Sequence, residues 1–138
     1  MPRHSRPLLP IWWALLVAAA AGAILDLAFP SVGWWPLAFV GVGLSLTTLI
    51  GRSVWGAWAV GTVFAASFYL LHVIWTTRYL GVVPWLALAG IETLLSGIAA
   101  IALTLSYRWL PRLAPGTMGR LVALPALVAG VWTAREQF

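Results

Sequence analysis

Long apolar stretches that are almost free of charge make up most of this chain and restrict what it can fold into. Five of them approach or reach the length of about 17–25 residues that a membrane-spanning helix needs. They cover residues 8–27, 34–50, 54–77, 82–107 and 121–138, the last one incomplete because Arg135 and Glu136 interrupt it. Only 8% of the 138 residues are charged, and a soluble domain of this size could not bury so much apolar surface. We expect an all-α integral membrane protein with a bundle of about five transmembrane helices.

The arginines orient these predicted helices. Helices are expected because the stretches show no alternation of polar and apolar residues, and because open strands leave backbone groups unpaired in lipid. Of eight arginines, six precede the first stretch or follow the second and fourth, whereas Arg78 and Arg135 fall on the other side. Positive charge collects on the cytoplasmic side, which predicts a cytoplasmic N-terminus. The net charge of +5 therefore reflects topology, and no nucleic-acid partner is expected.

A polar and aromatic cluster lies near the predicted outer end of the third stretch. It contains His72, Trp75, Arg78 and Tyr79. Arg78 could bind a lipid phosphate, and the aromatic rings suit a membrane interface, so the cluster is a candidate headgroup site. The alternative is ordinary interfacial anchoring. No metal site is expected, because no second ligand has a suitable spacing from His72.

Glu92 is the most informative charge in the chain. It lies about ten residues into the fourth stretch, where a carboxylate in hydrocarbon is costly. It could serve a proton relay, a cation site or a substrate path, or it could form a structural hydrogen bond between helices. Asp26, by contrast, lies near the outer interface, where headgroup water is expected to solvate it.

Small residues recur at intervals of four, which predicts close helix packing. The two stripes are Ala57, Gly61 and Ala65, and Ala89, Thr93 and Gly97. Packing within one bundle is the favoured interpretation, with a dimer face as the alternative. The sequence contains no recognisable set of catalytic residues. It has no cysteine, no lysine and no nucleophile elbow or phosphate loop. No cofactor is expected.

Three segments carry a family resemblance. The first is Leu25-Asp-Leu-Ala-Phe-Pro-Ser-Val-Gly-Trp-Trp-Pro-Leu-Ala-Phe39, in which a helix ends at a Phe-Pro turn. The second joins Phe68-Tyr-Leu-Leu-His-Val-Ile-Trp75 to Gly81-Val-Val-Pro-Trp-Leu-Ala-Leu-Ala-Gly-Ile-Glu92. The third is Leu124-Pro-Ala-Leu followed by Val131-Trp-Thr-Ala-Arg-Glu136. In order and spacing they resemble the N-terminal transmembrane portion of bacterial apolipoprotein N-acyltransferases, especially the actinobacterial members.

The resemblance implies a multi-pass enzyme of the bacterial inner membrane. Such an enzyme transfers a fatty acyl chain from a phospholipid to the N-terminal S-diacylglyceryl cysteine of an apolipoprotein, through a thioester on a cysteine in a nitrilase-like domain. Its implied partners are membrane lipids, the phospholipid acyl donor and the apolipoprotein acceptor. The candidates for a lipid or substrate path are Trp75, Arg78, Tyr79 and Glu92.

None of the family's catalytic residues can be assigned, because the sequence has no cysteine or lysine and ends before that domain would begin. We therefore expect residues 1–138 to form a single N-terminal transmembrane domain that lacks the catalytic domain and is inactive alone. The alternative is a complete small membrane protein, such as a transporter-like subunit or an assembly partner, in which Glu92 would be the functional carboxylate.

Overall fold

A computed structural model describes residues 6–30, 32–113 and 116–135, and all the regular structure in these ranges is helical. The elements are α1 (Ile11–Asp26), α2 (Pro36–Leu49), α3 (Val54–His72), a 3₁₀ turn η1 (Ile74–Thr76), α4 (Thr77–Leu80), α5 (Val82–Leu113), a π-helical turn η2 (Gly119–Ala123) and α6 (Leu124–Arg135). The prediction of an all-α chain is therefore confirmed. Arg3, which precedes the first apolar stretch, and Glu136, which ends the third resembling segment, lie outside the described residues.

Local chemistry explains several helix ends. Pro36 opens α2, where a missing N–H costs nothing. Ser53 caps α3, because its hydroxyl accepts a hydrogen bond of 3.1 Å from the Gly56 N–H. Gly81 has a φ of 87°, which favours glycine, and it turns the chain between α4 and α5.

The third and fourth helices differ in length from the predicted stretches. α3 ends at His72 rather than near residue 77, and the chain continues through η1 and α4. Val73, Ile74, Thr76 and Thr77 are β-branched and weaken a helix, and the Thr76 and Thr77 hydroxyls bond the carbonyls three residues earlier. α5 instead runs on to Leu113, six residues beyond the prediction.

Before α6 the backbone forms the π-helical turn η2. Pro125 has no N–H, so it cannot donate to the carbonyl four residues earlier. The Leu124 N–H instead bonds the carbonyl of Gly119, five residues back, which is the pattern of a π-turn.

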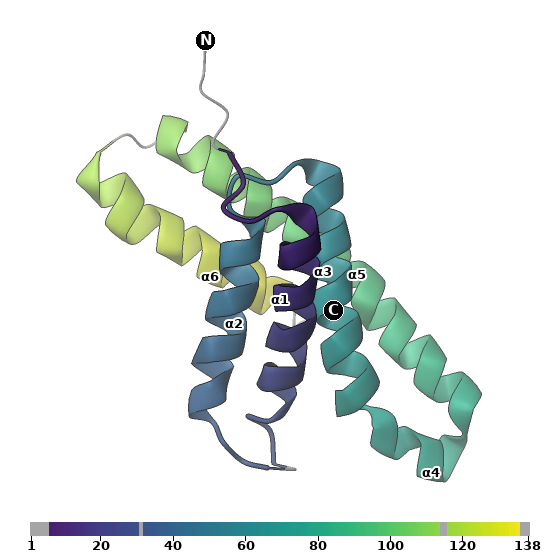
Figure 1. The fold of residues 1–138 in the computed structure, drawn as a ribbon. Helices are drawn as coiled ribbons and strands as arrows, with labels where there is room; N and C mark the ends of the chain where they lie inside the picture. The colour runs from purple at the N-terminus through teal and green to yellow at the C-terminus, as the bar shows by residue number, and fades with distance from the viewer. Residues whose placement is uncertain (1–5, 31, 114–115, 136–138) are drawn as a thin grey trace.

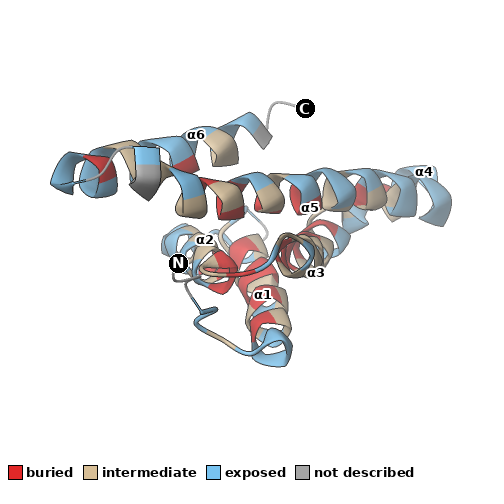
Figure 2. Ribbon diagram, turned by 90° about the horizontal axis from the view of Figure 1, so that it is seen from above, coloured by how far each residue is buried: buried red, intermediate tan, exposed pale blue. Residues whose placement is uncertain are grey.

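The helices stack in successive layers. α1 lies between α2 and α3, α3 packs along α5, and α6 packs against α5 (Figure 1). Seen from above, α5 and α6 form a second layer over the first three helices (Figure 2). α1 and α3 run in the same direction. We call the end that carries Arg6, Arg52 and Arg108 the Arg52 end, and the opposite end, with Asp26, His72 and Trp75, the Trp75 end.

Small residues allow the helices to approach closely. A Cβ at Gly22 of α1 would clash with the Phe64 carbonyl of α3, and a Cβ at Gly61 of α3 would clash with Ala100 of α5. Gly97 of α5 likewise lies against Trp58 and Thr62. Residues of both predicted stripes are therefore buried between helices of this bundle, which agrees with the favoured interpretation of packing within one bundle.

The distribution of side chains differs from that in a soluble protein. The buried positions are mostly alanine, glycine, serine and threonine, and Thr104 is fully buried. Large apolar side chains point outward, with Trp55 80% exposed and Phe39 73% exposed. Figure 2 shows the exposed positions on the outer sides of the helices. So much exposed apolar surface is typical of a surface that meets lipid.

Helix length separates the five apolar helices into two groups. In the described ranges, Val54–His72 and Val82–Leu110 are long and apolar enough to cross a membrane. Ile11–Asp26, Pro36–Leu49 and Gly119–Ala134 are apolar but shorter. Two membrane-length helices are thus present, and the five-span bundle stays a prediction.

Arg52 joins four parts of the fold at its end of the bundle. Its side chain is buried, and it donates from Nε to the Thr48 carbonyl at 2.7 Å and from Nη2 to the Leu9 carbonyl at 2.8 Å. Arg108 of α5 in turn donates to the Arg52 carbonyl. Burial lowers the pKa of Arg52 from its ordinary value, but an arginine remains protonated in a protein. One guanidinium therefore holds the start of α1 to the α2–α3 connection.

Candidate functional site

Three of the four residues in the predicted headgroup cluster lie on one short segment at the Trp75 end, and the fourth, His72, ends α3 just before it. Trp75 belongs to η1, and Arg78 and Tyr79 belong to α4. The rings of Trp75 and Tyr79 meet edge to face with centroids 6.3 Å apart. Both rings are largely exposed, at 58% and 79%, and Arg78 is exposed beside them. Two amphipathic rings and one cation could hold a phosphate at a membrane interface.

Glu92 is not part of that cluster. It lies on α5 ten residues after Val82, which places it about 15 Å along the helix. Its side chain is half-buried, and it forms no hydrogen bond or ion pair with another described residue. The interhelical hydrogen bond considered for it is therefore not seen.

Asp26 and His72 form a pair that the sequence reasoning missed. The His72 Nδ1 lies 3.1 Å from the Asp26 Oδ1, and both side chains are largely shielded from solvent. The His72 ring stacks on Phe68 and meets Phe29 edge on, with centroid distances of 4.8 and 4.4 Å. Asp26 is thus paired, not simply solvated by headgroup water.

One signal could have found this pair. Asp26 is the last residue of α1, and His72 is the last residue of α3. The predicted topology makes these two helices parallel, so their final residues lie at the same level. In the described ranges, no group of three or more His, Cys, Asp or Glu side chains is placed to hold a metal ion.

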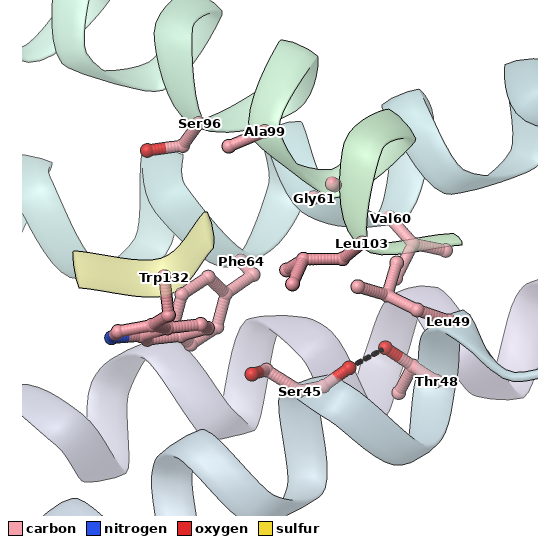
Figure 3. Close-up of a pocket in the computed structure, with 11 residues that line it drawn as sticks. Ser45, Thr48, Leu49, Val60, Gly61, Phe64, Ser96, Ala99, Leu103 and Trp132 are labelled. Carbon is pink, nitrogen blue, oxygen red and sulfur yellow. Dashed lines mark hydrogen bonds between the residues drawn. The ribbon is translucent and has the colours of Figure 1, made fainter. Parts of the chain in front are cut away.

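A small cavity lies in the middle of the bundle (Figure 3). It has a volume of about 20 Å³ and lies among α2, α3, α5 and α6. The Ser45 and Thr48 hydroxyls donate to carbonyls of α2, whereas the buried Ser96 hydroxyl has no partner among the described residues. Such a volume holds about one water. This cavity is therefore too small for an acyl chain.

A larger apolar cleft opens between α2 and α6. Its volume is about 480 Å³, within the range of small-molecule sites. Val42 and Leu46 of α2 form one wall, Val128 and Trp132 of α6 form the other, and Tyr107 of α5 lies between them. Trp132 also lines the small cavity and contacts the Phe64 ring, with centroids 5.9 Å apart. No sequence pattern predicts this cleft, because its apolar lining residues differ little from those on the other apolar helix faces.

The family model described as "Apolipoprotein N-acyltransferase N-terminal domain" matches residues 21–138. A protein of Mycolicibacterium smegmatis named apolipoprotein N-acyltransferase is 34% identical over 96 residues, which cover 68% of this chain and 16% of that relative. No solved structure matches the chain at a significant level. The chain belongs to the family of the apolipoprotein N-acyltransferase N-terminal domain.

Proposed function

We propose that this chain is the membrane-embedded N-terminal part of an enzyme that transfers a fatty acyl chain from a phospholipid to the N-terminal S-diacylglyceryl cysteine of an apolipoprotein. The family match supports the assignment. The observation that carries the membrane placement is the large number of exposed apolar side chains around a core in which most buried positions are small or hydroxyl-bearing residues. The matched segment is 16% of its relative, and the acyl transfer itself is assigned to the remainder of the enzyme.

The proposed placement is a multi-pass bundle in the bacterial inner membrane with a cytoplasmic N-terminus. Arg6, Arg52 and Arg108 gather at one end of the structure, which suits the cytoplasmic side. α3 and α5 have the length of full spans, and α1, α2 and α6 are shorter apolar helices beside them. The Trp75 end then faces the outer side.

We assign the Trp75 end to the phospholipid donor. Trp75, Arg78 and Tyr79 are exposed together at this end, and Arg78 would bind the headgroup phosphate. The half-buried Glu92 stays a candidate for the substrate path, deeper along α5. The cleft between α2 and α6 offers apolar surface to one acyl chain, and each buried CH₂ group contributes about 0.8 kcal/mol.

A chimeric enzyme tests this proposal. The matched segment of the Mycolicibacterium smegmatis relative is replaced by the corresponding residues of this chain, and acyl transfer from phospholipid vesicles to a lipopeptide is measured. We expect the chimera to be active, and we expect Arg78→Ala to raise its KM for phospholipid about tenfold, because a charge-assisted hydrogen bond is lost. Arg120→Ala, which removes an exposed arginine elsewhere, is the control. An inactive but folded chimera, or an unchanged KM in the Arg78→Ala chimera, would contradict the proposal.

A further inference from the structure

A second polar site lies at the Arg52 end, away from the proposed donor site. It is a cleft of about 610 Å³, and three arginines line it: Arg6, Arg52 and Arg108. We propose that this cleft binds the phosphate of an anionic membrane lipid at the cytoplasmic face. This inference rests on the proposed membrane placement but not on acyl transfer.

The guanidinium groups can donate several hydrogen bonds to one phosphate. Arg52 uses two of its five N–H donors on the carbonyls of Thr48 and Leu9. These bonds fix the buried side chain in place, and its other donors have no partner among the described residues. Arg6 is exposed and Arg108 is half-buried, so both can reach a ligand in the cleft. Arginine is well suited to phosphate because its planar fork can bind two oxygens.

Two helix N-termini add to the positive potential. Ile11, the first residue of α1, and Ser53, the cap of α3, both line the cleft. Figure 1 shows the two helices starting at the same end of the bundle. Neither helix has an acidic residue in its first turn, so no carboxylate there offsets the partial positive charge of unpaired N–H groups.

No carboxylate neutralises the arginines within the described lining. Asp26 is paired with His72 at the opposite end, and Glu92 lies within α5. Among the described residues, the cleft therefore holds three fixed positive charges without a counter-ion. Basic pockets between membrane helices on the cytoplasmic side bind anionic lipid headgroups.

The surroundings favour a lipid over a free phosphate ion. Trp12 and Trp13 on the first turn of α1 and Trp55 on the first turn of α3 all point outward, at 76%, 63% and 80% exposed. Exposed tryptophans gather at the level of the headgroups in membrane proteins. They place the cleft where the headgroup of a lipid can reach it while the acyl chains stay in the bilayer.

The test is lipid binding by the purified 138-residue chain in a neutral detergent. Native mass spectrometry would count bound phosphatidylglycerol and phosphatidylcholine during titration. We expect phosphatidylglycerol to bind about tenfold more tightly than phosphatidylcholine. Arg6→Gln and Arg108→Gln should each remove most of this preference, whereas Arg120→Gln, which removes the same charge outside the cleft, should keep it. Circular dichroism shows which variants fold. If Arg108→Gln does not fold, Arg6→Gln decides the outcome, because Arg6 is exposed and its replacement should not disturb the fold.

Three results would overturn the inference. The first is an equal affinity for both lipids in the unmodified chain. The second is that Arg120→Gln loses as much of the preference for phosphatidylglycerol as Arg6→Gln and Arg108→Gln do, which would mean that the net positive charge of the chain attracts the lipid. The third is displacement of phosphatidylglycerol by inorganic phosphate at the same concentration, which would assign the cleft to a free anion. An inactive chimera would leave this binding result standing, so the two proposals can fail separately.

Discussion

Replacement of Gly22 by leucine is expected to separate α1 from α3 and to lower the free energy of unfolding by about 3 kcal/mol. A Cβ at this position would clash with the Phe64 carbonyl, and it would lie 3.0 Å from the Phe68 nitrogen and 3.0 Å from the Ser67 Cβ. Two of these obstacles are backbone atoms, so a change of side-chain rotamer cannot relieve the clash.

The matched control for this variant lies on the same helix. Ala20→Leu adds bulk on the exposed side of α1 and should change the free energy of unfolding by less than about 0.5 kcal/mol. Unfolding can be followed by circular dichroism during titration with sodium dodecyl sulfate in mixed micelles. Equal stability of the Gly22→Leu and Ala20→Leu variants would show that α1 does not pack on α3 at Gly22.

Arg52→Leu is expected to lower the free energy of unfolding by about 3 kcal/mol, because it removes two hydrogen bonds from a charged donor to backbone carbonyls. The carbonyls of Thr48 and Leu9 would lose their guanidinium partner, and the start of α1 would lose its link to the α2–α3 connection. The same titration measures the effect. Arg120→Leu makes the same exchange at an exposed position, and it should have little effect on stability. If Arg52→Leu lowered the free energy of unfolding no more than Arg120→Leu, the structural role of Arg52 would be refuted.

The sequence predicted the helical class and several contacts between helices. The stripe of Ala57, Gly61 and Ala65 indicated close packing. The structure buries all three residues and places Gly61 against Ala100 of α5. The arginine pattern grouped Arg6, Arg52 and Arg108 on one side, and they line one cleft. These features follow from local periodicity and from charge between apolar stretches, which a single sequence carries.

Other features depend on tertiary contacts that no local pattern shows. Arg52 is only 4% exposed, whereas the sequence reasoning treated it only as a loop charge. Its burial depends on the Leu9 carbonyl, 43 residues away. Asp26 and His72 meet because α1 and α3 are parallel and end at the same level. The end of α3 was misplaced for a different reason, since the run of β-branched residues after His72 was counted as apolar length.

The membrane placement of the bundle is the central claim, and the absence of cysteine from the chain makes it directly testable. Single cysteines are placed at Leu8 and Thr117 on the proposed cytoplasmic side, and at Val32 and Val83 on the proposed outer side. All four positions are exposed. Spheroplasts that express each variant are treated with a membrane-impermeant maleimide, before and after permeabilisation. The proposed topology predicts immediate labelling of Val32→Cys and Val83→Cys, and labelling of Leu8→Cys and Thr117→Cys only after permeabilisation. Labelling of all four before permeabilisation, or recovery of the chain in the soluble fraction, would contradict it.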